Sequence, residues 1–231
     1  MPAGPPSTIA IDGPAAGGKS TIGKALAERL DYLYLDTGAM YRAVTLLVLE
    51  KGLDPTDDQA VAAMAATPIE IGPPEAGLSD GRPYTVAVGD RDITWAVRSP
   101  LVDVHVSTVA ANPAVRRQLV EQQRRIGQRG RVVMVGRDIG TVVMPEADLK
   151  IYLDASAEER ARRRHAERLA REEHSDYESL LGEMHERDRR DASRETSPMR
   201  PAEDAYIIDS TGLSADEVVD MILELIAARE T

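Results

Sequence analysis

A glycine-rich segment near the start of the chain ends in a lysine and a serine, a combination suited to binding phosphate. Residues 13–20 read GPAAGGKS, which matches the P-loop spacing G-x-x-x-x-G-K-[ST]. The glycines let backbone N–H groups approach phosphate oxygens, and the N-terminus of the next helix adds a partial positive charge. Lys19 would reach the β and γ phosphates of a nucleoside triphosphate, and the Ser20 hydroxyl would help to hold Mg²⁺. The predicted triphosphate site consists of Gly13, Pro14, Ala15, Ala16, Gly17, Gly18, Lys19, Ser20 and Thr21.

Two later segments each place an arginine just after an expected strand. Residues 36–42 read DTGAMYR, and residues 136–141 read GRDIGT. Ligands of open α/β sheets bind at the carboxyl ends of the strands, so Arg42 and Arg137 would converge on one anion there. The alternative interpretation is a pair of turns that carry surface charges.

A cluster of arginines lies in the last third of an otherwise acidic chain, whose net charge is -11. Acidic residues occur among these arginines at helical spacings, which favours a solvated helix face for many of them. A minority can still bind phosphate. The net acidity argues against broad nucleic-acid binding, because that requires a basic surface. The cluster comprises Arg160, Arg162, Arg163, Arg164, Arg168, Arg171, Arg187, Arg189, Arg190, Arg194 and Arg200.

Strands and helices alternate around these motifs, and this alternation predicts an α/β fold with a parallel sheet. Between residues 67 and 94, Pro and Gly turns instead separate short alternating runs, which predicts a small antiparallel insertion. Helical signals return after the Ser99–Pro100 pair, and Pro113 is placed near a helix start. The other predicted elements are strands at 8–12, 32–36, 132–135, 149–153 and 206–209, and helices at 19–31, 39–50, 157–172, 177–189 and 214–228.

Composition narrows the class of protein. A length of 231 residues, 42% of them hydrophobic, suits one α/β domain with appendages. The absence of Cys excludes disulfides and thiolate metal sites. No apolar run approaches the roughly 20 residues that a membrane span needs, and the first residues do not read as a signal peptide. We therefore expect a cytoplasmic enzyme without a membrane anchor, and a monomer because no coiled-coil pattern is present.

Together the motifs resemble bacterial cytidylate kinases, which are P-loop nucleoside-monophosphate kinases, over essentially the whole chain. The matching segments occur in the same order as in that family: IAIDGPAAGGKST, LDTGAMYR, GRDIGTVV, KIYLDAS with the following EER, and ERDRRDASRE. The resemblance implies a P-loop kinase fold with a central parallel five-stranded sheet, helices on both faces, a β-rich NMP-binding insertion and a helical lid. It divides the single domain into a core (1–63, 97–156 and 190–231), an insertion (about 64–96) and an Arg-rich lid (about 157–189).

The resemblance also implies a reaction and its residues. ATP would phosphorylate CMP or dCMP to CDP or dCDP, with Mg²⁺ as cofactor. Arg163 would lie near the donor nucleotide, and Lys19, Arg137 and Arg187 would act on the transferring phosphates. The implied contacts of CMP are Arg42 and Arg137 with the phosphate, Thr37, Arg116, Asp138 and Arg194 with the cytosine, and Ser107, Arg187 and Asp191 with the sugar, while Tyr41 also lines the site.

One position departs from the family pattern. Family members commonly carry an acidic residue immediately before the GRD motif, whereas this chain has Val135 there. A carboxylate contact to Mg²⁺ or its water must then come from elsewhere. Asp36, which ends the neighbouring strand, is one possibility, although it could equally cap the helix that follows.

Two alternative functions remain open at the level of sequence. One is a kinase for UMP, another nucleotide or a small metabolite, because arginine-bound anions are not unique to CMP. The other is a nucleotide-dependent switch or assembly protein, because a P-loop by itself indicates only triphosphate binding. The second alternative leaves Arg42, Arg137 and Arg187 without a role.

Overall fold

The computed structural model describes residues 5–74, 77–78, 80–170, 172–193 and 199–229. The predicted central sheet is confirmed: it has five strands in the order β2-β6-β1-β7-β8, and each strand pairs in parallel with its neighbours. β1 lies in the middle, so the loop that follows it begins at the centre of the sheet's carboxyl edge. The strands are β1 (Thr8–Asp12), β2 (Leu33–Asp36), β6 (Val132–Val135), β7 (Leu149–Asp154) and β8 (Tyr206–Asp209).

Successive residues of each strand point to opposite faces of the sheet, and both faces are covered. On one face, Val135 of β6 packs against α1 (Lys19–Leu30) at Gly23, and α8 (Ala215–Arg229) packs beside α1. On the other face, Met134 lies near Met144, and Met144 contacts α5 (Pro113–Gly127) at Gly127. This two-residue period follows from strand geometry. Because both faces of the sheet are covered, the buried strands read as continuous apolar runs.

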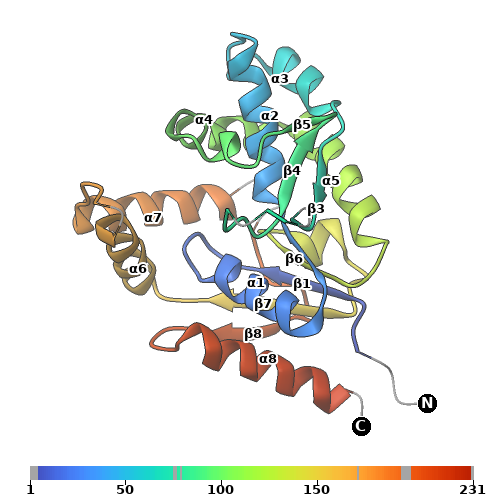
Figure 1. Cartoon of the computed structure of the whole chain (residues 1–231). Coiled ribbons are helices and arrows are strands. Elements are labelled where there is room, and N and C mark those ends of the chain that lie inside the picture. The colour runs from blue at the N-terminus through green and yellow to red at the C-terminus, as the bar shows by residue number, and fades with distance from the viewer. Residues whose placement is uncertain (1–4, 75–76, 79, 171, 194–198, 230–231) are drawn as a thin grey trace.

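A second lobe stands above the sheet, next to its edge strand β2 (Figure 1). It holds the predicted antiparallel insertion, a sheet in the order β3-β4-β5 with antiparallel pairing. The helices around it come from the segments that follow β2 and β5, so the lobe overhangs the loops after β1 and β6. Its elements are α2 (Gly38–Glu50), α3 (Asp58–Ala65), β3 (Glu70–Gly72), β4 (Thr85–Val88), β5 (Arg91–Asp92), η1 (Ala96–Arg98), α4 (Pro100–Ala111) and α5.

The Arg-rich segment forms two helices, α6 (Ala157–Ala170) and α7 (Tyr177–Ala192), which pack on each other and extend as an arm from the sheet (Figure 1). Their joint core is small and separate from the main one. It contains Ala161 of α6 and Met184 of α7 together with Ala15 of the loop after β1. The root of the arm is therefore packed directly against the predicted triphosphate loop.

Three elements were not expected from sequence: α3, the short 3-10 turn η1 and the π-helical turn η2. α3 is capped by the Asp57 side chain, which accepts hydrogen bonds from the backbone N–H groups of Gln59 and Ala60. A π-helical turn, η2 (Ile139–Val143), follows the GRD motif. Among the helices of the described residues, none is both long enough and apolar enough to cross a membrane.

Candidate functional site

The loop after β1 has a shape that only small residues permit. Gly13 has φ +144°, and a Cβ atom there would lie 2.0 Å from the carbonyl oxygen of Leu153 in β7. Gly18, with φ +89°, stands at the N-cap of α1, and no side chain of the described residues caps that first turn. The first backbone N–H groups of α1 are therefore left to a ligand, as an anion site at a helix N-terminus requires.

Lys19 lies inside this loop. It is only 7% exposed, and its Nζ donates to the Pro14 carbonyl oxygen at 2.5 Å. Burial, together with the nearby guanidinium of Arg137, holds the pKa of Lys19 well below its usual value. An anion bound by the loop would raise the pKa of Lys19 again, because a negative charge beside the ammonium favours its protonated form.

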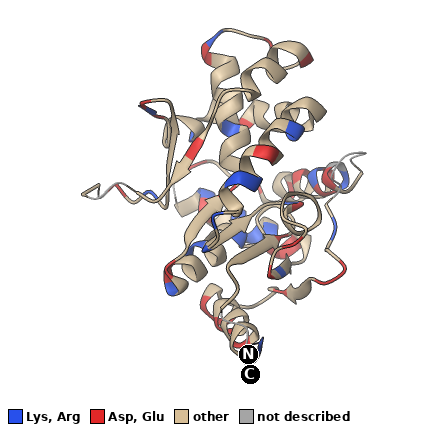
Figure 2. Cartoon of the chain, turned by 90° about the vertical axis from the view of Figure 1, so that its right-hand side faces the viewer, with Lys and Arg blue, Asp and Glu red and all other residues tan. Residues whose placement is uncertain are grey.

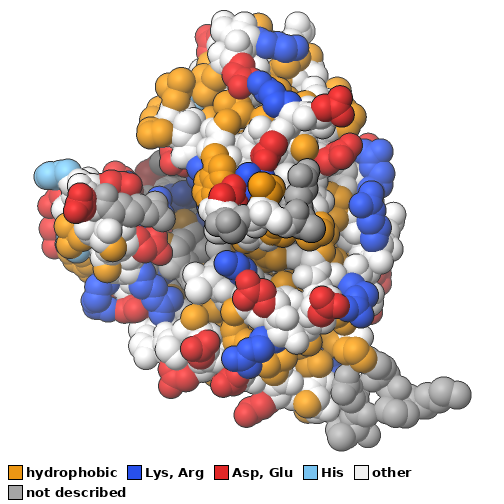
Figure 3. Space-filling model, viewed as in Figure 1, with side chains coloured by type: hydrophobic (Ala, Val, Ile, Leu, Met, Phe, Trp, Pro, Cys, Tyr) orange, Lys and Arg blue, Asp and Glu red, His pale blue; other side chains and the backbone are white. Residues whose placement is uncertain are grey.

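A single cleft of about 1160 Å³ connects this loop with the lobe above it and the arm beside it. Figure 2 shows several Lys and Arg residues near the middle of the molecule, where the lobe meets the sheet, and Figure 3 shows basic side chains on the underside of the arm. Of the predicted site residues, Gly13 and Pro14 are not in the lining, and Arg194 lies outside the described residues. Those that line the cleft are Ala15, Ala16, Gly17, Gly18, Lys19, Ser20, Thr21, Asp36, Thr37, Tyr41, Arg42, Ser107, Arg116, Arg137, Asp138, Arg163, Arg187 and Asp191.

The two strand-end arginines do converge on this cleft, and each is held by a carboxylate. Arg42 pairs with Asp103 of α4 at 2.5 Å. Arg137 donates from Nε to Asp191 of α7 at 2.9 Å, and from Nη1 to the Gly13 carbonyl oxygen at 3.0 Å. Arg137 thus joins the GRD loop, the P-loop and the arm.

A third pair lies deeper, between α5 and the GRD loop. Arg116 donates from Nη2 to Asp138 Oδ2 at 2.5 Å, and both side chains are less than a tenth exposed. The guanidinium also lies 5.7 Å from the ring centre of Tyr41. Thr37 is beside them, with its hydroxyl donating to the Val135 carbonyl oxygen at 2.9 Å. Such a buried set of donors and acceptors can distinguish the edges of flat heterocycles.

The GRD loop is held by a carboxylate that sequence reasoning missed. Asp12, the last residue of β1, accepts hydrogen bonds from the backbone N–H groups of Ile139 and Gly140, both at 2.7 Å. Asp12 is 4% exposed, and burial raises its pKa to about 6 in spite of these two donors. Asp138 raises this pKa further and Lys19 lowers it. The only sequence signal was a carboxylate at the end of an apolar strand.

The buried Asp12 carboxyl is expected to make stability depend on pH. Its folded pKa of about 6 exceeds the unfolded value near 3.8, so the folded state binds the extra proton between these values. The contribution of Asp12 to the free energy of unfolding should fall by about 3 kcal/mol as pH rises through this window, at 1.36 kcal/mol per pKa unit. Urea denaturation of wild type and Asp12→Asn at about pH 4 and about pH 7 measures the change. A difference between the two proteins that stays constant with pH would contradict it.

Asp36 lies where it could replace the acidic residue that Val135 does not provide. Val135 is buried, and Asp36 sits beside it in the neighbouring strand. One carboxylate oxygen of Asp36 accepts from the Gly38 N–H at the start of α2 at 2.9 Å, and the other lies 3.5 Å from Ser20 Oγ. Asp36 therefore caps α2 with one oxygen and directs the other toward the P-loop.

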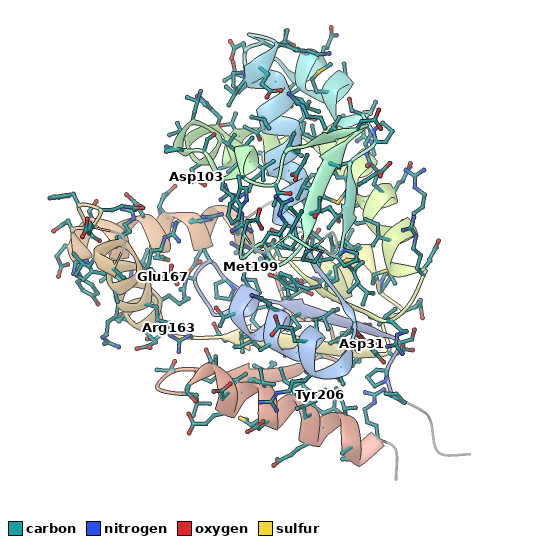
Figure 4. The ribbon with its side chains drawn as sticks, viewed as in Figure 1. Asp31, Asp103, Arg163, Glu167, Met199 and Tyr206 are labelled. Atoms are coloured by element: carbon teal, nitrogen blue, oxygen red, sulfur yellow. The ribbon has the colours of Figure 1, made fainter. Side chains whose placement is uncertain are left out.

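Arg163 reaches the P-loop from the arm. Its Nε donates to Glu159, and its Nη atoms donate to the side chain and the carbonyl oxygen of Ser210, just after β8, at 3.2 and 2.6 Å. A Cβ atom at Gly18 would lie 3.6 Å from Arg163 Nη1. Figure 4 shows Arg163 on the arm and Asp103 in the lobe above it.

Sequence reasoning also missed several residues that line the cleft. Arg98, Tyr34 and Tyr84 line the cleft, and Ser210 does so next to Arg163. None of them belongs to a motif with a spacing of its own, so only the fold brings them together.

Comparison with known proteins agrees with this geometry. The family model described as cytidylate kinase matches residues 9–228. A cytidylate kinase from Chloroflexus aggregans is 53% identical over 218 residues, which cover 94% of this chain and 93% of that protein. A cytidylate kinase from Carboxydothermus hydrogenoformans is 50% identical over 222 residues, covering 96% and 97%. A solved gluconokinase from Sinorhizobium meliloti is similar in fold, with a TM-score of 0.50 at 16% identity, over 98% of this chain and 94% of that one.

Proposed function

Because this chain belongs to the cytidylate kinase family, we propose that it transfers the γ-phosphoryl group of ATP to CMP or dCMP, releasing ADP and CDP or dCDP. The observation that carries the proposal is the single cleft in which a P-loop faces Arg42, in the helix after β2, and Arg137, in the loop after β6. A triphosphate and a monophosphate bound there would have their phosphates next to each other. Such positioning is most of what phosphoryl transfer needs from a protein.

The proposed donor subsite is the P-loop with Arg163. Backbone N–H groups at the start of α1 and the ammonium of Lys19 would bind the β and γ phosphates. Arg163 is held beside Gly18 by Ser210, which supports a place for it near the donor nucleotide. ATP is proposed as the donor because P-loop phosphotransferases commonly use it.

The residues present fit Mg²⁺, which prefers oxygen ligands and usually keeps several waters. Ser20 Oγ and the free oxygen of Asp36 form a pair of oxygen ligands next to the phosphate loop. Val135 offers no ligand, so we assign to Asp36 the carboxylate role that the family pattern places before GRD. Held there with ATP, Mg²⁺ would neutralise negative charge on the phosphates.

The proposed acceptor subsite is the lobe side of the cleft. Arg42, Arg137 and Arg187 are assigned to the phosphates, since guanidinium forks match phosphate oxygens in a bidentate way. The buried Arg116–Asp138 pair with Thr37 is assigned to the cytosine edge. Ser107 and Asp191 are assigned to the sugar, Tyr41 supports Arg116, and Arg194 stays a prediction for the base.

The chemistry would need no strong general base. The attacking oxygen belongs to a phosphate whose second pKa is about 6, so it is already largely anionic at neutral pH. It forms the new bond to the γ-phosphorus while the bond from that phosphorus to the bridging oxygen breaks, and the electrons leave with ADP. Lys19 and the arginines stabilise the spread negative charge. Closure of the arm, proposed as a lid over about 157–189, would keep water from accepting the phosphoryl group.

The preferred acceptor nucleotide can be identified by an activity assay. With ATP and Mg²⁺, we expect kcat/KM for CMP and dCMP to exceed that for AMP by at least about 100-fold, because a site built for one base edge leaves polar groups unpaired with another. A coupled assay of ADP formation over CMP, dCMP, UMP and AMP measures this. Highest turnover with UMP or AMP would instead indicate a kinase for that nucleotide. Slow ADP formation without stimulation by any acceptor would favour a switch protein.

The remaining assignments follow from composition. The net charge of -11 argues against a broadly basic surface, which supports small nucleotides, and not nucleic acid, as partners. The lack of Cys is consistent with a reducing compartment, so we place the activity in the cytoplasm. A monomer suffices for it, because every assigned residue comes from one chain.

A further inference from the structure

Arg98 lies next to the proposed phosphate site, although no sequence motif pointed to it. It ends η1, immediately before α4, and lines the cleft. Arg42 donates to the carbonyl oxygen of Val97, the preceding residue, at 3.3 Å. Burial and the charge of Asp36 raise the pKa of Tyr84 to about 12, while Arg98 and Arg42 lower it. Arg42 and Arg98 both line the lobe wall of the cleft.

Two aromatic rings hold the Arg98 guanidinium in position. Its Cζ lies 5.2 Å from the ring centre of Trp95 and 5.7 Å from that of Tyr84, and Nη2 lies 3.5 Å from the Tyr84 hydroxyl oxygen. Both rings are themselves fixed. The Trp95 indole N–H donates to Asp80 at 2.8 Å, and Tyr84 packs on Tyr34 with ring centres 5.6 Å apart. Cation–π contacts orient a cation without cancelling its charge.

Arg98 differs from several other arginines of the cleft in having no carboxylate partner among the described residues. Within the part of the chain that the structure describes, no carboxylate forms an ion pair with Arg98. The nearby carboxylate of Asp36 is already engaged with Gly38 and directed at Ser20. Other cleft arginines have carboxylate partners, in the pairs Arg42–Asp103, Arg116–Asp138, Arg137–Asp191 and Arg163–Glu159.

We propose that Arg98 binds the phosphate of the acceptor nucleotide together with Arg42, and that Trp95 and Tyr84 preorganise it for this task. The inference rests on the proposed function, because it takes a nucleoside monophosphate as the acceptor. A guanidinium held by ring faces keeps its N–H edges for a ligand, and phosphate oxygens match those edges. Because the rings fix the side chain before binding, little conformational entropy is lost when the phosphate arrives.

A comparison of CMP with cytidine isolates the phosphate contact. Calorimetric titration of Arg98→Met should show the Kd for CMP raised by about 10- to 100-fold, the range for a lost hydrogen bond to a charged group. The Kd for cytidine should stay close to wild type, because cytidine has no phosphate. Arg125→Met, which removes an exposed arginine of α5 outside the cleft lining, should change neither.

The outcomes separate this inference from a purely structural role. An unchanged Kd for CMP, or equal weakening of CMP and cytidine, would overturn it. If Arg98→Met loses both ligands through misfolding, Arg98→Lys decides: a selective loss of CMP affinity supports the contact, and an equal effect on both ligands overturns it. Wild-type turnover of CMP is measured alongside. If the wild-type protein turns over CMP and the Kd of Arg98→Met for CMP is unchanged, only the Arg98 assignment is contradicted. If the wild-type protein does not turn over CMP, the proposed function itself is contradicted.

Discussion

Replacement of Lys19 with methionine is expected to lower kcat by about 100- to 1000-fold, the range found when one group that stabilises transition-state charge is removed. Lys19 is buried at the centre of the P-loop, with its Nζ 2.5 Å from the Pro14 carbonyl oxygen. No other lysine lies in that loop. The loss should appear in kcat at saturating ATP and CMP, measured by coupled formation of ADP, because the charge acts on the transferring phosphoryl group.

The same substitution should leave stability intact, which separates a catalytic loss from unfolding. Burial and Arg137 hold the pKa of Lys19 well below its unfolded value. The folded state therefore binds this proton less tightly than the unfolded state does, and the lysine reduces stability at any pH below the unfolded pKa. We expect the midpoint of urea unfolding for Lys19→Met to equal or exceed that of wild type at neutral pH.

A control lysine is available at the end of α2. Lys51 is exposed and lies outside the cleft lining, so Lys51→Met should keep the wild-type kcat. A folded Lys19→Met protein with a kcat near that of wild type would contradict the role assigned to the P-loop lysine.

The sheet was predictable because its strands are short apolar runs between turn residues. The strands predicted at 8–12, 132–135 and 206–209 match β1, β6 and β8. β1 and β6 are buried on both faces and read as continuous apolar runs, whereas the edge strand β8 is mostly exposed. The P-loop was predictable for another reason, since all its residues lie in one short segment with a characteristic spacing.

The turn after the GRD motif shows where local pattern fails. Residues 139–143 read IGTVV, whose β-branched residues favour a strand, yet the segment forms the π-helical turn η2. Its first two N–H groups are held by Asp12, which lies more than 120 residues earlier in the chain. A contact so distant in sequence overrides the local preference, and no sequence window contains it.

The arginine cluster could be recognised from sequence, but the sequence did not show which of its members are buried and which are exposed. Arg162 and Arg189 are largely exposed and pair with glutamates one turn away, as expected for a solvated helix face. Arg160, on the same helix as Arg162, is 4% exposed. The difference arises from what α6 packs against, namely α7 and the P-loop, and that packing is decided by tertiary structure.

Arg160 links the arm directly to the P-loop, and its replacement with methionine is expected to destabilise the protein by about 3 kcal/mol. Its guanidinium donates to both carboxylate oxygens of Asp188 in α7, at 3.2 and 2.5 Å, and to the Ala15 carbonyl oxygen at 3.2 Å. Breaking a buried pair leaves a carboxylate without its partner, which costs about 3–5 kcal/mol. The lower end applies because Asp188 is 25% exposed. Urea unfolding gives the value.

The neighbouring Arg162 provides the matched control. It is 66% exposed and pairs with Glu159 within one helical turn. Arg162→Met should therefore change the free energy of unfolding by less than about 0.5 kcal/mol. Equal effects of the two substitutions would show that the Arg160 pair is no stronger than a surface pair.

The double variant Arg160→Met/Asp188→Leu separates the two roles of Arg160. Without Asp188, no carboxylate is left unpaired, so much of the lost stability should return, as it does when a buried ion pair is replaced by apolar residues. The hydrogen bond to the Ala15 carbonyl oxygen does not return. The P-loop then lacks the hydrogen bond from Arg160 to Ala15, and small displacements of groups that position a reaction are costly. We expect kcat in the double variant to stay at least about tenfold below wild type. A recovery of both stability and kcat would show that the Arg160 side chain serves folding alone.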